Sequence, residues 1–320
     1  MSAEASPFQG VIPVLPTPFH DDETLDLTSL ERIVTFAVEQ GVNGLTLLGV
    51  LGEANRLTGA ERTRLIRVVV QAAPGLPVIV GTSHAGTAAT IALSREAADL
   101  GAAAIMVAPS KQPAPSDETV FDYFHRVAEK TSLPIVLQDH PQSTEVHMPV
   151  SLILRLVQEI PAIACIKAEA TPSPSKIAAL RAGLIQSGRP VTILTGLGGL
   201  YGFFDLERGS DGFNTGFAFP EVLVAIMRCA RAGDWDGAYR IYRRYLPLIV
   251  FEQQPGLAIR KEILRQRGLL SCGLVRHPGA NIDPATQSQL GHLLSRTFPC
   301  QDLTKPVRIE VHDVISPAGT

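Results

Sequence analysis

The sequence predicts an α/β protein, a (β/α)8 TIM barrel with a C-terminal helical extension. Short apolar segments alternate with longer amphipathic segments eight times between residues 10 and 233, and the apolar segments are nearly continuous in Val, Ile, Leu and Ala. Continuous apolar strands are typical of parallel sheets that are covered on both faces. Eight strand–helix units in succession are the number that closes a barrel. An open doubly wound sheet is the competing interpretation.

Each predicted strand is a short apolar run bounded by Gly, Pro or polar residues, which is the pattern of a buried parallel strand. The predicted strands cover residues 10–19, 44–49, 77–83, 103–109, 134–141, 163–169, 192–198 and 211–216.

A segment with helical periodicity follows each strand. In the first of these segments Leu30, Ile33, Val34 and Ala37 share one face, and Thr28 is placed to cap the start of the helix. The eight predicted helices cover residues 27–41, 58–73, 87–101, 116–131, 149–160, 171–183, 200–206 and 220–233.

The chain changes character after the eighth unit. Residues 235–252 and 256–268 are helical in pattern with no strand between them. We therefore expect a barrel over residues 8–233, a C-terminal helical segment over residues 234–297, and a loosely ordered tail over residues 298–320.

Composition narrows the class of protein. The chain is 45% hydrophobic and 18% charged, with a net charge of -3 and no run of Lys or Arg, so nucleic acids and anionic membranes are poor candidates as partners. The first residues lack a secretory signal, and no apolar run approaches the roughly 20 residues of a membrane span. The four widely spaced cysteines favour reduced thiols over a disulfide framework or a zinc cluster. We expect a soluble cytoplasmic protein.

One predicted strand, residues 163–169, contains a lysine where its apolar run ends. Lysine is rarely buried without a partner, so Lys167 calls for an explanation. In a (β/α)8 barrel the carboxyl ends of the strands carry the chemistry. A lysine in an apolar barrel mouth loses the hydration of its ammonium group, which favours the neutral amine, and a neutral amine forms a Schiff base with a ketone. The alternative is a strand-end lysine that merely pairs with a carboxylate.

Glu169 strengthens the catalytic interpretation of Lys167. Residues two apart on a strand face the same way, so both side chains can enter the barrel mouth. A carboxylate beside an imine is placed to move the protons that enamine chemistry requires. Because the protonated imine is itself the electron sink, no organic cofactor is needed. A plain ion pair is the alternative.

Two glycine-containing loops follow other strands. Glycines around a turn let backbone N–H groups approach a small anion, such as the carboxylate of a 2-keto acid. The candidate residues after the second strand are Gly49, Val50, Leu51, Gly52 and Glu53. After the seventh strand, Gly196 in the sequence TGLGG leaves space for a substrate.

Four features, taken in order along the chain, resemble the dihydrodipicolinate synthase/N-acetylneuraminate lyase family. They are PTPF at residues 16–19, G-x-x-G-E at residues 49–53, Lys167, and T-G-x-x after the seventh strand. The resemblance covers residues 10–266. It implies a (β/α)8 barrel, a homotetramer or homodimer, and a pyruvate or 2-keto sugar acid substrate held on a lysine. Lys167 falls at the family's Schiff-base lysine, and residues 49–53 fall at its carboxylate-binding loop.

The sequence departs from this family where the family has tyrosines. Gln138 replaces the tyrosine of Y-N-x-P, Lys111 stands near a second expected tyrosine, and Ser143 replaces the arginine that binds the aldehyde substrate of the synthase. Val50 and Leu51 replace hydroxyl residues of the loop. The resemblance therefore does not imply lysine biosynthesis or ordinary sialic-acid cleavage.

Q-D-x-P together with Glu169 is similar to the branch of the family that dehydrates 2-keto-3-deoxy sugar acids. If Glu169 moves the protons, a tyrosine is dispensable, and Gln138, Asp139 and His140 can bind substrate hydroxyls. His140 bonded to a loop carbonyl and Asp139 capping a loop are equal alternatives. For His84 a purely local role is favoured.

The sequence thus predicts a class I aldolase- or dehydratase-type lyase acting on a 2-keto acid, by aldol-type cleavage, condensation or dehydration. Two other functions stay open. A metal-dependent barrel aldolase would use His84, His140, Asp139 and Glu53 as ligands, although their spacing fixes no site. A non-catalytic barrel could bind a keto acid as a sensor.

Overall fold

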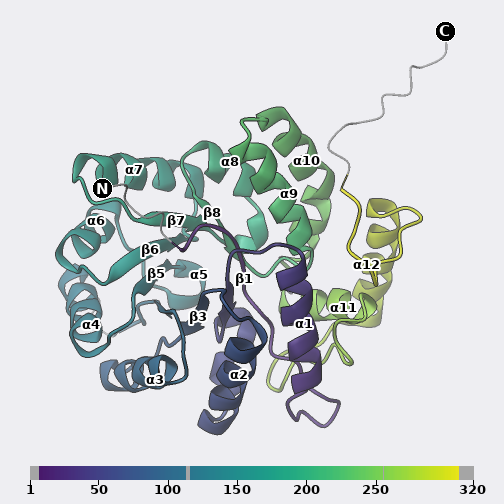
Figure 1. The fold of residues 1–320 in the computed structure, drawn as a ribbon, viewed down its shortest axis with the longest axis horizontal. Helices are drawn as coiled ribbons and strands as arrows, with labels where there is room; N and C mark the ends of the chain where they lie inside the picture. Colours follow the sequence, from purple (N-terminus) through teal and green to yellow (C-terminus); the bar gives the residue numbers. More distant parts are fainter. Residues whose placement is uncertain (1–6, 113–115, 255, 310–320) are drawn as a thin grey trace.

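The protein is a barrel of eight parallel strands surrounded by helices, as predicted (Figure 1). The computed structural model describes residues 7–112, 116–254 and 256–309. The strand order is β1-β8-β7-β6-β5-β4-β3-β2, and a parallel bridge between Val14 and Thr46 closes the ring between β1 and β2. The strands are β1 (Gly10–Pro13), β2 (Leu45–Leu47), β3 (Val78–Gly81), β4 (Ala104–Val107), β5 (Ile135–Asp139), β6 (Ile163–Ala168), β7 (Thr192–Thr195) and β8 (Gly212–Thr215).

Eight longer helices follow the strands in turn, and a short helix and three 3-10 turns lie in the loops at the carboxyl ends of the strands. The long helices are α1 (Leu27–Glu39), α2 (Gly59–Ala72), α3 (Thr87–Asp99), α4 (Asp117–Lys130), α6 (Val150–Glu159), α7 (Ser173–Gln186), α8 (Gly202–Glu207) and α9 (Pro220–Arg231). The short elements are α5 (Pro141–Thr144), η1 (Val50–Gly52), η2 (Ala54–Arg56) and η3 (Leu197–Gly199).

The cap of α1 differs from the prediction. Asp26, and not Thr28, precedes the first helical residue, and its carboxylate accepts a hydrogen bond from the backbone N–H of Ser29 at 2.9 Å. Thr28 is already inside the first turn, where its hydroxyl cannot satisfy the free N–H groups of the helix start.

Strand alternation divides the apolar residues into two layers. Val136, Cys165 and Leu194 belong to a small cluster of strand residues inside the barrel, whereas Leu137, Ile166 and Ile193 pack in the large core shared with the helices. On β5 and β6 the residues that continue the inner row toward the carboxyl end are Gln138 and Lys167. The inner apolar cluster therefore forms the floor beneath Lys167.

The C-terminal helices α10 (Trp235–Phe251), α11 (Leu257–Gln266) and α12 (Pro284–Thr297) pack outside the ring beside α9 and α1 (Figure 1). The predicted boundary after residue 233 falls between α9 and α10. Of the tail predicted to be loosely ordered, residues 310–320 lie outside the described residues.

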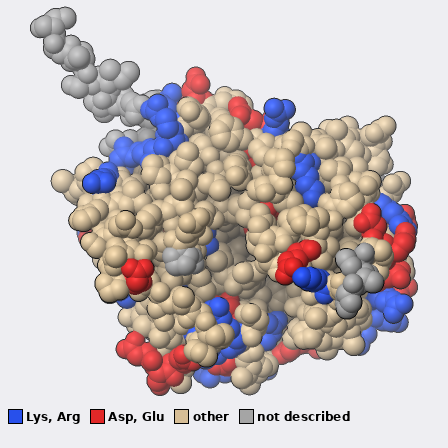
Figure 2. All heavy atoms as spheres, turned by 180° about the vertical axis from the view of Figure 1, so that it is seen from behind, with Lys and Arg blue, Asp and Glu red and all other residues tan. Residues whose placement is uncertain are grey.

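Basic and acidic side chains are mixed around the periphery of the face in Figure 2, and no extended surface of one charge is visible there. Across residues 7–112, 116–254 and 256–309, every helix is too short or too polar to cross a membrane.

A buried carboxyl group links three elements on the outer side of β7. Asp205 of α8 is 1% exposed and accepts hydrogen bonds from the hydroxyls of Thr195 and Ser173, the latter at 2.9 Å. Burial outweighs these two hydrogen bonds and raises the pKa of Asp205 from 3.8 to about 6.

Asp205 is expected to make stability depend on pH. Between pH 4 and 6 the unfolded chain loses the Asp205 proton while the folded chain keeps it. The free energy of unfolding therefore falls by about 3 kcal/mol as the pH rises through this range. Above the folded pKa both states are ionised at Asp205, and its contribution to the free energy of unfolding no longer changes with pH. Urea unfolding of the wild type and Asp205→Asn at several pH values measures this contribution. The difference between the two proteins should change over this window; parallel curves would contradict the assignment.

Candidate active site

Lys167 and Glu169 lie side by side at the rim of the barrel. Both point inward because they are two residues apart on β6 and its continuation, and each is only 5% exposed. The Nζ atom of Lys167 lies 3.4 Å from Oε2 of Glu169. The structure thus brings together the amine and the carboxylate that the sequence pairs.

Glu169 is held by two further donors. The Nε2 amide of Gln138 donates to its Oε2 at 2.8 Å, and the backbone N–H of Leu197 donates to its Oε1 at 3.2 Å. Burial alone would raise the pKa of Glu169, but Lys167, His140 and these two donors outweigh it, and the pKa is lowered below 4.5. Glu169 is therefore an ionised base at neutral pH.

Gly196 makes room for this carboxylate. A Cβ atom at position 196 would lie 2.1 Å from Oε1 of Glu169, so any other residue would displace the side chain. Gly196 was predicted to leave space for a substrate, whereas in the structure the Glu169 side chain occupies the space beside it.

His140 stands next to the pair. Its Nδ1 atom lies 2.5 Å from the hydroxyl of Ser143, and the ring is half-buried. Burial lowers the pKa of His140, although the nearby Glu169 carboxylate opposes that shift. The imidazole is therefore neutral near pH 7.

The loop after β2 presents two backbone N–H groups. Within the described residues, the amides of Val50 and Leu51 donate no hydrogen bond, whereas those of Gly52 and Glu53 close the turn η1. Gly49 faces Met106 of the inner layer. The side chain of Leu51 covers the end of β8, and that of Val50 is 59% exposed. The N–H groups of Val50 and Leu51 are therefore available to an anion, and binding of a carboxylate by this loop stays a prediction.

Glu53 and Asp139 do not face the barrel mouth. The Glu53 carboxylate is fully buried against Lys261, with Oε1 2.5 Å from Nζ. Asp139 follows the inward-facing Gln138 by one residue, so it points out toward α7, where its Oδ2 lies 2.6 Å from Nζ of Lys176. The predicted hydroxyl-binding role of Asp139 is therefore wrong in geometry, and Glu53 belongs behind the loop rather than in contact with substrate.

The ligands suggested for a metal site are scattered. His84 is exposed and accepts a hydrogen bond at Nδ1 from the N–H of Gly86 in its own loop, the local role favoured from sequence. Among the described residues, no three His, Cys, Asp or Glu side chains are grouped so that they could hold a metal ion. Lys111 forms an exposed ion pair with Glu145 and does not reach Lys167.

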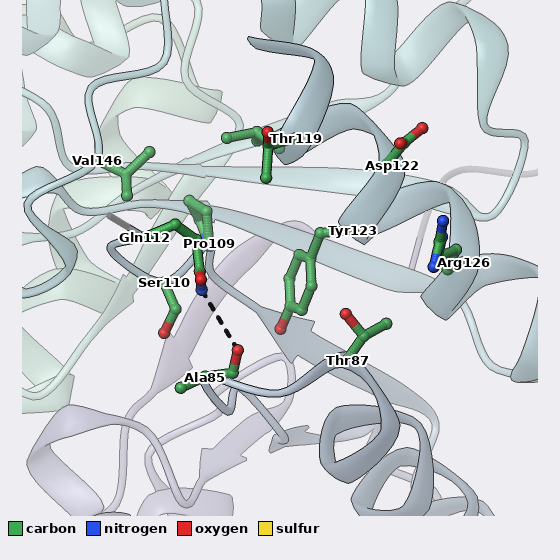
Figure 3. A pocket seen from close by; sticks show the side chains of 11 residues that line it. Ala85, Thr87, Pro109, Ser110, Gln112, Thr119, Asp122, Tyr123, Arg126 and Val146 are labelled. Carbon is green, nitrogen blue, oxygen red and sulfur yellow. Dashed lines mark hydrogen bonds between the residues drawn. The ribbon is translucent and has the colours of Figure 1, made fainter. Parts of the chain in front are cut away.

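A pocket of about 310 Å³ lies between the first turn of α3 and the side of α4 that carries Tyr123 and Arg126 (Figure 3). In its lining the amide of Gln112 donates to the carbonyl of Ala85 at 3.4 Å, and Tyr123 and Arg126 project from α4. Lys167 and Glu169 do not line this pocket. We therefore place the chemistry at the barrel rim and not in this side pocket.

Sequence reasoning missed three contributors to the site: the Leu197 amide, Thr17 and Lys261. The hydroxyl of Thr17 donates to the carbonyl of Gly52 at 2.6 Å. Lys261 is separated from Glu53 by 208 positions. In the sequence, Lys261 is a lysine between Arg260 and Glu262 on a predicted helix, and this pattern does not identify Glu53 as its partner.

Comparisons with known proteins identify relatives of this chain. The model of the dihydrodipicolinate synthetase family matches residues 7–297. The chain is 32% identical over 313 residues to the L-2-keto-3-deoxyarabonate dehydratase of Azospirillum brasilense, an alignment that covers 93% of this chain and 98% of the relative.

Solved structures of related enzymes also superpose on this chain. A dihydrodipicolinate synthase from Rhodopseudomonas palustris superposes with a TM-score of 0.87 at 39% identity, covering 92% of this chain and all of that chain. A prophage protein of the dihydrodipicolinic acid synthase family from E. coli K12, solved in complex with pyruvate, superposes with a TM-score of 0.84 at 27% identity, covering 91% of this chain and 98% of that chain. The chain therefore belongs to the dihydrodipicolinate synthetase family of lyases.

Proposed function

We propose that this enzyme dehydrates a 2-keto-3-deoxy sugar acid through a Schiff base on Lys167. The observation that carries the proposal is the buried Glu169 carboxylate, 3.4 Å from the lysine amine, with Gln138 in the place of the family's tyrosine. All five tyrosines of the chain lie on or beside outer helices. The pyruvate complex of one relative and the dehydratase name of another support this substrate class.

The proposed reaction uses one carboxylate twice. Glu169 accepts the proton that the Lys167 ammonium must lose, and the free amine attacks C2 of the keto acid. Glu169 then returns that proton to the C2 oxygen, which leaves as water, so that a protonated imine and a free carboxylate remain. The carboxylate then removes a proton from C3, and the resulting enamine expels the C4 hydroxyl, which leaves as water with that proton. A C3–C4 double bond has formed, and hydrolysis of the imine releases the unsaturated keto acid and restores Lys167.

The remaining rim groups orient the substrate in this proposal. The free N–H groups of Val50 and Leu51 bind its carboxylate. Gln138 fixes Glu169, and His140 contacts a hydroxyl of the sugar chain. The lysine imine supplies the electron sink, so the reaction needs no further cofactor.

Product analysis with 2-keto-3-deoxy pentonic and hexonic acids tests the proposal. Dehydration converts the substrate into a product lighter by one water, with no pyruvate released. Pyruvate and an aldehyde as products would mean aldol-type cleavage instead. Binding in a thermal-shift assay with neither product would contradict catalysis and favour the keto-acid sensor.

A further inference from the structure

Helix α11 of the C-terminal segment contacts the loop of residues 49–53 from behind. Lys261 of this helix is fully buried, and its Nζ atom lies 2.5 Å from Oε1 of Glu53 and 2.7 Å from the carbonyl of Leu274. The ammonium also lies 4.5 Å from the centre of the Phe19 ring. A charge buried this deeply is retained only if its partners are held in place.

The other oxygen of Glu53 is equally occupied. Oε2 accepts hydrogen bonds from Arg56 at 2.8 Å and from the backbone N–H of Arg276 at 3.0 Å. Glu53 itself has φ of 53°, a left-handed conformation that is uncommon for residues other than glycine. The ion pair with Lys261 therefore fixes the point at which the loop reverses direction.

This fixed point controls the part of the loop that faces the substrate. The N–H of Glu53 bonds to the carbonyl of Val50 at 3.2 Å, so the end of the loop and its anion-binding start are one turn. Thr17 holds the carbonyl of Gly52 from a second side. A shift of the Glu53 carboxylate would thus tilt the free N–H groups of Val50 and Leu51.

We propose that Lys261 is a positioning residue for the carboxylate of the keto acid, acting through Glu53 on the backbone amides of residues 50 and 51. This inference rests on the proposed function, because it assumes that the loop binds a keto acid carboxylate. It makes the C-terminal helical segment part of the binding machinery of the barrel. The amine chemistry at Lys167 is left intact, so affinity and not the capacity for imine formation depends on Lys261.

Borohydride trapping at increasing pyruvate concentrations separates these two quantities. In Glu53→Gln and in Lys261→Met, the pyruvate concentration that gives half-maximal trapping should rise at least about tenfold, while trapping at saturation still reaches the wild-type level. The double variant should resemble either single variant, because both remove the same contact. If Lys261→Met does not fold, the shift measured in the isosteric Glu53→Gln variant alone tests the inference.

Glu221→Gln is the matched control. Glu221 forms a comparably buried pair with Arg267, with an N–O distance of 2.5 Å, and its described contacts do not reach residues 49–53. In Glu221→Gln the pyruvate concentration that gives half-maximal trapping should stay within about twofold of the wild-type value. An unshifted Glu53→Gln, or an equal shift in Glu221→Gln, would overturn the inference. Absence of trapping in the wild type with pyruvate and with longer keto acids would instead refute the proposed Schiff base.

Discussion

Replacing Lys167 by alanine is expected to abolish covalent capture of keto acids and to lower turnover by roughly a thousandfold or more. The chain has six lysines, and Lys167 is the one that lies on a strand and faces the barrel mouth. Without its amine no imine forms, and the electron sink for removal of the C3 proton is lost. Borohydride reduction followed by intact mass measurement and peptide mapping shows whether the keto acid is bound covalently and which peptide carries it.

The fold should survive the loss of Lys167. Glu169 keeps its hydrogen bonds from Gln138 and from the Leu197 amide, so its carboxylate is not left without partners. Lys176→Ala is the matched control, because it removes another largely buried lysine that pairs with a strand-end carboxylate, Asp139. That variant loses stability but should still be trapped at Lys167. An adduct that persists in Lys167→Ala and maps to another peptide would refute the assignment.

The period of two along a β-strand made much of the site predictable. It places Lys167 and Glu169 on the same inward face, and in the structure Nζ of Lys167 lies 3.4 Å from Oε2 of Glu169. The same rule, applied from Gln138, turns Asp139 outward. The wrong expectation for Asp139 arose because it was grouped with its neighbours in a strand-end motif and not assigned a face.

The barrel itself was predictable because each of its strands and helices has a local signature of apolar spacing. The contacts behind the rim have no such signature. Glu53 reads as part of a glycine-containing anion loop, yet its partner Lys261 comes from a helix 208 positions away. The Leu197 amide is a backbone group, so its bond to Glu169 depends on the conformation of η3 and not on the identity of the side chain. Both contacts are set by tertiary packing and not by a local sequence pattern.

Glu169→Gln is expected to separate imine formation from the steps that follow it. Glutamine has the same shape and can still accept the hydrogen bond from the Leu197 amide, but it cannot take up a proton. Trapping with pyruvate should persist, whereas turnover of the sugar acid should fall by about 10²–10⁴-fold, the usual contribution of a positioned acid–base group. Single-turnover experiments that follow the imine by trapping and the product by mass spectrometry measure the two steps separately.

Asp205→Asn is the control for this substitution, because it also neutralises a buried carboxyl group near the end of a strand. Asp205 faces the hydroxyls of Thr195 and Ser173 on the outer side of β7, away from Lys167, so its neutralisation should leave turnover near the wild-type level. The wild-type carboxylate is already ionised at neutral pH because its pKa is lowered. The glutamine amide has no group that titrates there, so raising the pH should not restore the variant. Normal turnover in Glu169→Gln would assign the proton transfers to another rim group. His140, whose neutral imidazole lies beside the pair, would then be the residue to replace next.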